Sequence, residues 1–265
     1  MVHIRRFGFS GALAVSLVVV MLFGINPITV LTGQVAKPLP YTPLTALAAL
    51  AAGEGQPADL VGALERETDG FWARGFRNGA TYYPPSRLTM VASHDGLGCG
   101  LAGSDIGTFY CPEDSTIYVD MSAYAALVAA HPQTGHLAEA YLIGLAYGHH
   151  VQNAQKLYDP ATEETASLPQ GEREQRLSAQ AACYAGASSK WAGLPQMLDS
   201  PDIVAAITAG LAGGGDVTRA TSRTNVPVPR DFAPASAELT RQWFNAGYGI
   251  PAIGTCRFDR ITLAP

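Results

Sequence analysis

The histidines are the residues whose type and spacing could do metal chemistry in this sequence. There are six of them: His3, His94, His131, His136, His149 and His150. Two histidines four residues apart on a helix lie about 40° apart around its axis, so both can bind one metal ion. His149 and His150 are adjacent and point about 100° apart, so they cannot readily chelate one ion. We therefore interpret His149 as a hydrogen-bonded core residue and His150 as a surface residue.

The helix expected over residues 137–157 would carry both of these histidines. His136 and Glu139 lie two to three turns before His149, too far to share a metal ion with it. A metal site that has moved and uses His94 or His131 remains an alternative. The spacing alone thus gives no chelating set.

The elements that must position these residues are mostly helical. Apolar periodicity and turn residues predict helices and short strands in an α+β arrangement. The expected helices are 44–52, 59–76, 122–130, 137–157, 174–191, 201–211 and 235–247. The expected strands are 88–93, 108–110 and 116–120, and residues 215–233 are expected to be extended.

The first 31 residues predict a membrane anchor. Arg5 and Arg6 precede an uncharged apolar run over residues 7–25, which spans about 28 Å as a helix and matches the bilayer core. The basic flank predicts that the rest of the chain lies outside the cytoplasm. A signal sequence is the alternative. We expect an anchor over 1–31, a linker over 32–56, a domain over 57–265, and a single-pass cell-membrane location.

The four cysteines agree with an oxidising compartment. Cys99, Cys111, Cys183 and Cys256 can pair in three ways. Proximity in sequence favours Cys99 with Cys111, which leaves Cys183 with Cys256.

The charge balance excludes one class of partner. The net charge is −5, and the basic residues form no cluster beyond the N-terminus. A nucleic-acid surface needs a basic face, so we expect no nucleic-acid partner.

Several ordered blocks carry a family resemblance. The longest runs from Gly135 to Gln152 and resembles the zinc helix of the neutral zinc metallopeptidase family. The other matching blocks are Trp72, Phe76, 83–85, 99–100, 109–114, 117–120, 180–186, 243–244, Gly247, Cys256 and Phe258. Together they cover residues 57–265. The resemblance implies a zincin-like domain behind an N-terminal membrane anchor.

The resemblance also implies a set of zinc-site positions. In this family an HExxH helix supplies two histidine ligands and a glutamate base, and a later helix supplies a third, acidic ligand. Here the two histidine positions are Leu145 and His149, the base position is Ala146, and the position of the third ligand is Ser178. Four residues later, where the family has a supporting acidic residue, this sequence has Ala182. Only His149 keeps a ligand type.

These losses predict a catalytically inactive homologue, a pseudopeptidase. We expect no catalytic residue and no cofactor, with zinc only if other ligands have rebuilt the site. The expected role is to bind or regulate a protein or peptide partner. An active peptidase of the same family is one candidate partner. The alternatives are an active zinc peptidase with a rearranged site and a purely structural envelope protein.

Overall fold

The computed structural model describes residues 42–78, 83–92, 107–159, 162, 166–211 and 235–263. The expected anchor, Cys99, His94 and the expected extended segment 215–233 lie outside these residues. Within the described part of the chain, no helix is long and apolar enough to cross a membrane. The chain divides into the units Met1–Tyr41 and Thr42–Pro265, and every element below belongs to the second.

The described residues form a mostly helical α+β domain, as expected. Its α-helices are α3 (Pro43–Ala51), α4 (Pro57–Asn78), α5 (Met121–Ala130), α6 (Gly135–Ala154), α8 (Gln170–Trp191), α9 (Pro201–Gly210) and α10 (Ala237–Gly249). Short 3-10 turns, η3 (Ile253–Cys256) and η4 (Phe258–Arg260), follow. Helix α6 ends three residues before the predicted Leu157, and Lys156 has a φ of 60°, which a helix cannot continue.

Three short strands form one sheet in the order β1-β3-β2. Strand β1 (Arg87–Val91) runs parallel to β3 (Thr116–Asp120), and β2 (Phe109–Cys111) runs antiparallel to it. Strand β3 is buried along its whole length. Its last residue, Asp120, caps α5 by accepting from the backbone N–H groups of Ser122 and Ala123.

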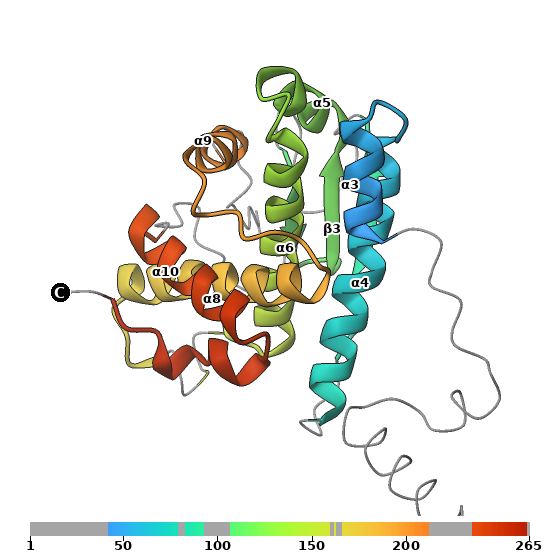
Figure 1. The fold of residues 1–265 in the computed structure, drawn as a ribbon. Helices are drawn as coiled ribbons and strands as arrows, with labels where there is room; N and C mark the ends of the chain where they lie inside the picture. The colour runs from blue at the N-terminus through green and yellow to red at the C-terminus, as the bar shows by residue number, and fades with distance from the viewer. Residues whose placement is uncertain are drawn as a thin grey trace, which may run out of the picture. The chain divides into compact units, whose positions relative to one another are not determined.

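Helix α6 lies at the centre of the domain, and α8 runs across it (Figure 1). Small residues allow the two backbones to approach closely. A Cβ on Gly148 would lie 2.8 Å from the carbonyl oxygen of Ala181, so only glycine fits there. Because strands and helices also cover its other sides, α6 is buried from Ala138 to Gln152.

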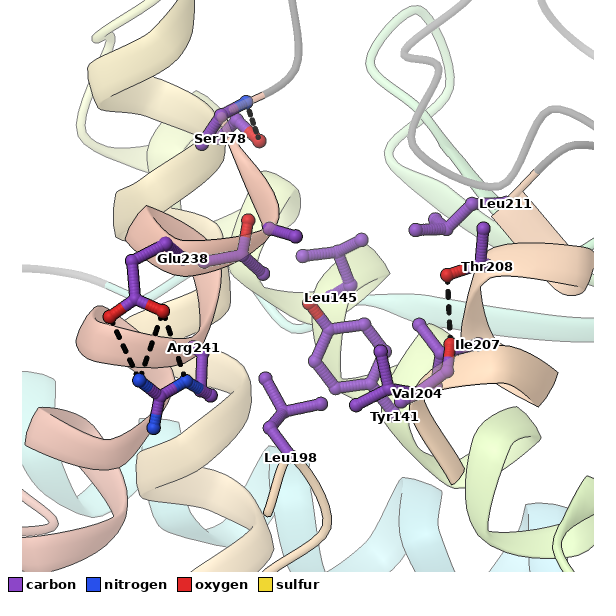
Figure 2. A pocket seen from close by; sticks show the side chains of 13 residues that line it. Tyr141, Leu145, Ser178, Leu198, Val204, Ile207, Thr208, Leu211, Glu238 and Arg241 are labelled. Atoms are coloured by element: carbon purple, nitrogen blue, oxygen red, sulfur yellow. Dashed lines mark hydrogen bonds and ion pairs between the residues drawn. The ribbon is translucent and has the colours of Figure 1, made fainter. Parts of the chain in front are cut away.

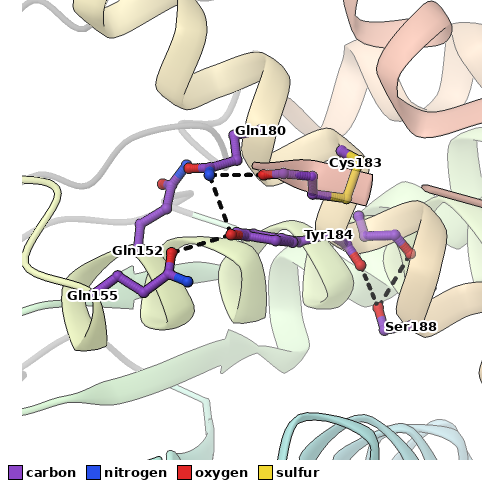
Figure 3. Close-up of a disulfide and its surroundings, with 8 residues drawn as sticks. Gln152, Gln155, Gln180, Cys183, Tyr184 and Ser188 are labelled. Carbon is purple, nitrogen blue, oxygen red and sulfur yellow. Dashed lines mark hydrogen bonds between the residues drawn. A yellow bond between two sulfur atoms is a disulfide. The ribbon is translucent and has the colours of Figure 1, made fainter. Parts of the chain in front are cut away.

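Helix α10 is held against α8 in two ways. A Cβ on Gly247 would lie 2.0 Å from the carbonyl oxygen of Cys183, so the helices meet at backbone distance. The disulfide between Cys183 and Cys256 then fastens the segment after α10, as predicted (Figure 3). Cys111 is disulfide-bonded too, whereas Cys99 lies outside the described residues.

Candidate functional site

Two of the predicted zinc-site positions line one cavity. Leu145 on α6 and Ser178 on α8 border a cavity of about 340 Å³. Residues of α10 line it on the side of Ser178, and residues of α9 line it on the opposite side (Figure 2). Its further lining residues are Tyr141, Leu198, Val204, Ile207, Thr208, Leu211, Ala235, Ala237, Glu238, Thr240 and Arg241. Most of this lining is apolar, so the cavity suits an apolar group.

Ser178 holds the chain that enters α10. Its Oγ accepts a hydrogen bond of 3.1 Å from the backbone N–H of Ala235, and the side chain is 4% exposed (Figure 2). A serine hydroxyl is neutral and weakly basic, unlike the carboxylate that zinc prefers as an oxygen ligand. At this position the chain therefore has a structural hydrogen bond.

Ala146 and Ala182 are fully buried, and neither lines the cavity. Alanine has no atom that accepts a proton, so neither residue can act as a base or hold a ligand in place. The cavity therefore collects Leu145 and Ser178, whereas Ala146, His149 and Ala182 are buried but do not line it.

His149 is buried and hydrogen-bonded, as expected from the sequence. Its Nδ1 lies 3.0 Å from Gln152 Oε1 and 2.8 Å from the Tyr158 hydroxyl. The amide nitrogen of Gln152 donates to the carbonyl oxygen of Leu177 at 2.7 Å, which fixes the orientation of the amide, so its Oε1 faces His149. An amide oxygen can only accept a hydrogen bond. We infer that His149 carries its proton on Nδ1.

A chain of buried amides joins this histidine to the C-terminal disulfide. Gln152 Nε2 donates to Gln180 Oε1 at 3.0 Å, and Gln180 Nε2 donates to the carbonyl oxygen of Cys256 at 2.8 Å. Gln180 also donates to the hydroxyl of Tyr184, which donates to Gln155 (Figure 3). These bonds satisfy polar groups from α6, α8 and the C-terminal segment within the core.

The interpretation of His150 as a surface residue is wrong. It is 1% exposed, with Nε2 2.8 Å from the carbonyl oxygen of Pro84 and Nδ1 3.2 Å from the Tyr110 hydroxyl. Burial lowers the pKa of His150, and the contact with Pro84 opposes this shift. The reason for the error is that α6 is covered on the His150 side as well as on the His149 side.

The donor set at the predicted ligand positions does not fit zinc. Structural and catalytic zinc sites use three or four nitrogen, sulfur or carboxylate donors, whereas these positions hold one histidine beside leucine, alanine and serine. Across the part of the chain that the structure describes, no three His, Cys, Asp or Glu residues are grouped to hold a metal ion.

The walls from α9 and α10 were not predicted from the sequence. On α9 the lining residues are Val204 and, one turn later, Ile207 and Thr208. This spacing shows that they share one face of the helix, but it does not show which other elements that face meets. On α10, Arg241 donates to both carboxylate oxygens of Glu238, at 2.8 and 2.9 Å. Arg241 also lies 3.9 Å from Asp199, so its charge is balanced at the cavity rim.

Comparisons with known proteins agree with this architecture. Residues 4–258 match the family described as "Putative neutral zinc metallopeptidase". The chain is 28% identical over 251 residues to the "Uncharacterized protein YpfJ" of Escherichia coli (strain K12), covering 92% of this chain and 85% of that protein. It is 34% identical over 179 residues to the "Uncharacterized protein Rv2575" of Mycobacterium tuberculosis (strain ATCC 25618 / H37Rv), covering 63% and 59%.

No solved structure matches the chain. The family match extends over nearly the whole length, including the α6 and α8 helices that carry the predicted ligand positions. The chain therefore belongs to the neutral zinc metallopeptidase family.

Proposed function

We propose that this protein is a zinc-peptidase homologue that does not hydrolyse peptides and instead binds an apolar segment of a protein partner in the cavity beside Leu145. The observation that carries the proposal is that Leu145 and Ser178, at two positions where the family places zinc ligands, line an apolar cavity. Hydrolysis by this family needs a metal-bound water and a base, and neither position supplies them.

The cavity favours an uncharged occupant. At about 340 Å³ it falls within the range of small-ligand sites, roughly 300–1,000 Å³. Tyr141, Leu145 and Ile207 offer apolar contact. The hydroxyl of Thr240 can bond a peptide backbone, and that of Thr208 can accept from a backbone N–H, since its own proton is donated to the carbonyl oxygen of Val204. Because Arg241 is already paired with Glu238, an anionic ligand gains little there. One large apolar side chain of an extended peptide meets these conditions.

The location of the protein follows the apolar N-terminal run. We propose that residues 1–31 anchor the chain in the cell membrane and that the zincin-like domain lies outside the cytoplasm. The disulfide between Cys183 and Cys256 supports an oxidising compartment. An active peptidase of the same family is one partner that would share this location.

The first test measures zinc and hydrolysis together. The full-length protein in detergent is equilibrated with zinc, dialysed and analysed by elemental mass spectrometry, then assayed on casein. We expect less than about a tenth of an equivalent of zinc and no cleavage, since a lone histidine is a weak ligand set. Nearly one equivalent with cleavage that His149→Ala abolishes would instead establish the alternative of a rearranged active site.

The variant Leu145→His/Ala146→Glu/Ser178→Glu is the positive control. It restores two ligand types, at positions 145 and 178, and the base at position 146. With His149 this completes the family's set of three ligands, so we expect the variant to retain about one zinc. A restored variant that also stays metal-free would show that the helices no longer hold the family's geometry.

The second test measures peptide binding. We expect the capped tripeptide acetyl-Ala-Phe-Ala-amide to bind saturably in calorimetric titrations. Val204→Trp should weaken binding at least about tenfold, because this partly exposed side chain lines the cavity. Ala205→Trp is the matched control, since Ala205 is the exposed neighbour of Val204 and does not line the cavity. Equal binding by both variants would exclude the cavity as the peptide site.

A further inference from the structure

A second cavity borders α6 at Glu139 and Leu142 and holds one ionisable side chain. Its volume is about 260 Å³, and its walls come from α5, α6 and α9. Those walls are small or apolar: Gly107, Ala123, Ala126, Leu127, Ala130, Leu142, Ala209 and Gly210. Glu139 is the only ionisable side chain among the described residues that line it, and it is 2% exposed.

The carboxyl group of Glu139 has a fixed orientation. The hydroxyl of Thr108, which lies just before β2, donates a hydrogen bond to its Oε1. The carboxyl group of Asp120 is close enough to repel a negative charge on Glu139. A carboxyl group held in an apolar pocket beside a second carboxyl group attracts a cation.

No neighbouring side chain supplies that cation within the described residues. The groups near Glu139 are Asp120, the Tyr124 hydroxyl and, beyond it, His136, whose Nδ1 lies 2.8 Å from that hydroxyl. Burial lowers the pKa of His136, so its ring is mainly neutral at pH 7. The lining includes no lysine or arginine.

The size of the cavity restricts the cation. Its volume lies just below the usual range for small-ligand sites, so the ligand has few heavy atoms. The alanine and leucine walls would contact methylene groups, which a hydrated metal ion lacks. We propose that this cavity binds a small primary alkylammonium group, with the ammonium on Glu139 and the alkyl chain between α5 and α9.

Protonation of Glu139 would oppose this binding. Burial, which is the main cause, and repulsion from Asp120 raise the pKa of Glu139 to about 7, while the Thr108 hydrogen bond lowers it. An alkylammonium group stays charged far above this pH, as lysine does. Only the carboxylate form binds, so the apparent Kd should be about tenfold weaker at pH 6 than at pH 8.

The test uses n-butylammonium chloride, with n-butanol and sodium butyrate as neutral and anionic probes of similar length. Ligand-observed NMR titrations of the full-length protein should show saturable binding of butylammonium at pH 8 and at least tenfold weaker binding of the other two. N-acetyl-lysine amide then distinguishes a peptide side chain from a free amine as the source of the group.

Matched variants locate the site. Glu139→Gln removes the charge but keeps an acceptor for Thr108, and it should abolish both the binding and its pH dependence. Ala126→Trp blocks the cavity from an exposed position of α5, whereas the equally exposed Ala125 does not line it, so Ala125→Trp should bind normally. Thermal unfolding confirms that each variant is folded.

Three results would overturn the proposal. If butanol binds as tightly as butylammonium, the cavity recognises only the alkyl chain, and the charge of Glu139 does not contribute to binding. Unchanged affinity in Glu139→Gln would place the amine elsewhere. Calcium that binds through Glu139 when butylammonium does not would make the cavity a metal-ion site.

Discussion

Successive turns of α6 have opposite surroundings. At Leu145 the helix borders an apolar cavity, whereas at His149 and Gln152 it is packed into a polar network that reaches α8 and Cys256. Buried polar groups are retained in the second region because each contributes to a connected set of hydrogen bonds. We expect from this difference that the network contributes more to the stability of the domain than the side chains that border the cavity.

The largest expected effect comes from the disulfide at the end of the network. Replacing Cys183 and Cys256 by alanine opens a loop whose ends are 73 residues apart, and we expect a loss of about 4 kcal/mol in the free energy of unfolding. Urea denaturation measures it. Wild-type protein under reducing conditions should lose at least as much, because the disulfide of Cys111 opens as well. A loss below about 1 kcal/mol in the alanine variant would mean that other contacts hold the C-terminal segment.

Gln152→Leu tests the centre of the network. The change leaves the Leu177 carbonyl and Gln180 Oε1 without their amide donor in the core, so we expect a loss of about 3 kcal/mol. Gln155→Leu, at the partly exposed end of α6, should cost about 1 kcal/mol or less in the same urea titrations. Similar losses from both would contradict the importance of the buried amides.

Glu139→Gln tests a carboxyl group that lies outside this network. The folded pKa of about 7 exceeds the ordinary value of 4.5, so the folded state favours the protonated form. The native protein should therefore lose stability as the pH rises from 4.5 to 7, by at most about 3 kcal/mol. The glutamine variant should lack this loss, being more stable than wild type at pH 8 and similar at pH 4.

Thermal unfolding at several pH values measures this difference. The expected profile requires the variant and the native protein to converge at low pH. A constant difference across pH 4–8 would show that Glu139 does not titrate in this range.

The smallest expected effect is a difference of about 2 kcal/mol between two leucine truncations, one in each region. Leu177 packs with Leu157, Tyr158 and Phe258, and Leu177→Ala should cost about 4 kcal/mol. Leu145 already borders a cavity, so truncating it adds less new empty volume to a packed core, and Leu145→Ala should cost about 2 kcal/mol. Equal costs in urea denaturation would mean that the cavity turn is packed as tightly as the network.

Much of the local structure could be predicted from the residues alone. Strand β3 matches its predicted range, and α5, α8 and α9 overlap theirs closely, because apolar periodicity, prolines and capping residues act over a few positions. The pairing of Cys183 with Cys256 was also predicted correctly.

The chemistry available at the predicted zinc-site positions is likewise a property of the sequence. Leucine and alanine side chains have no donor atom in any environment, so it can be read without a structure that positions 145, 146 and 182 supply neither a metal ligand nor a base.

Only the tertiary structure decided what surrounds these positions. His150 is buried because β2 and the segment at Pro84 cover it, and Ser178 bonds to Ala235, 57 residues away. Glu139 likewise depends on Thr108, 31 residues earlier. A side chain's donors and charge are intrinsic, but its burial, partners and pKa come from segments distant in sequence, and local patterns do not encode which segments those are.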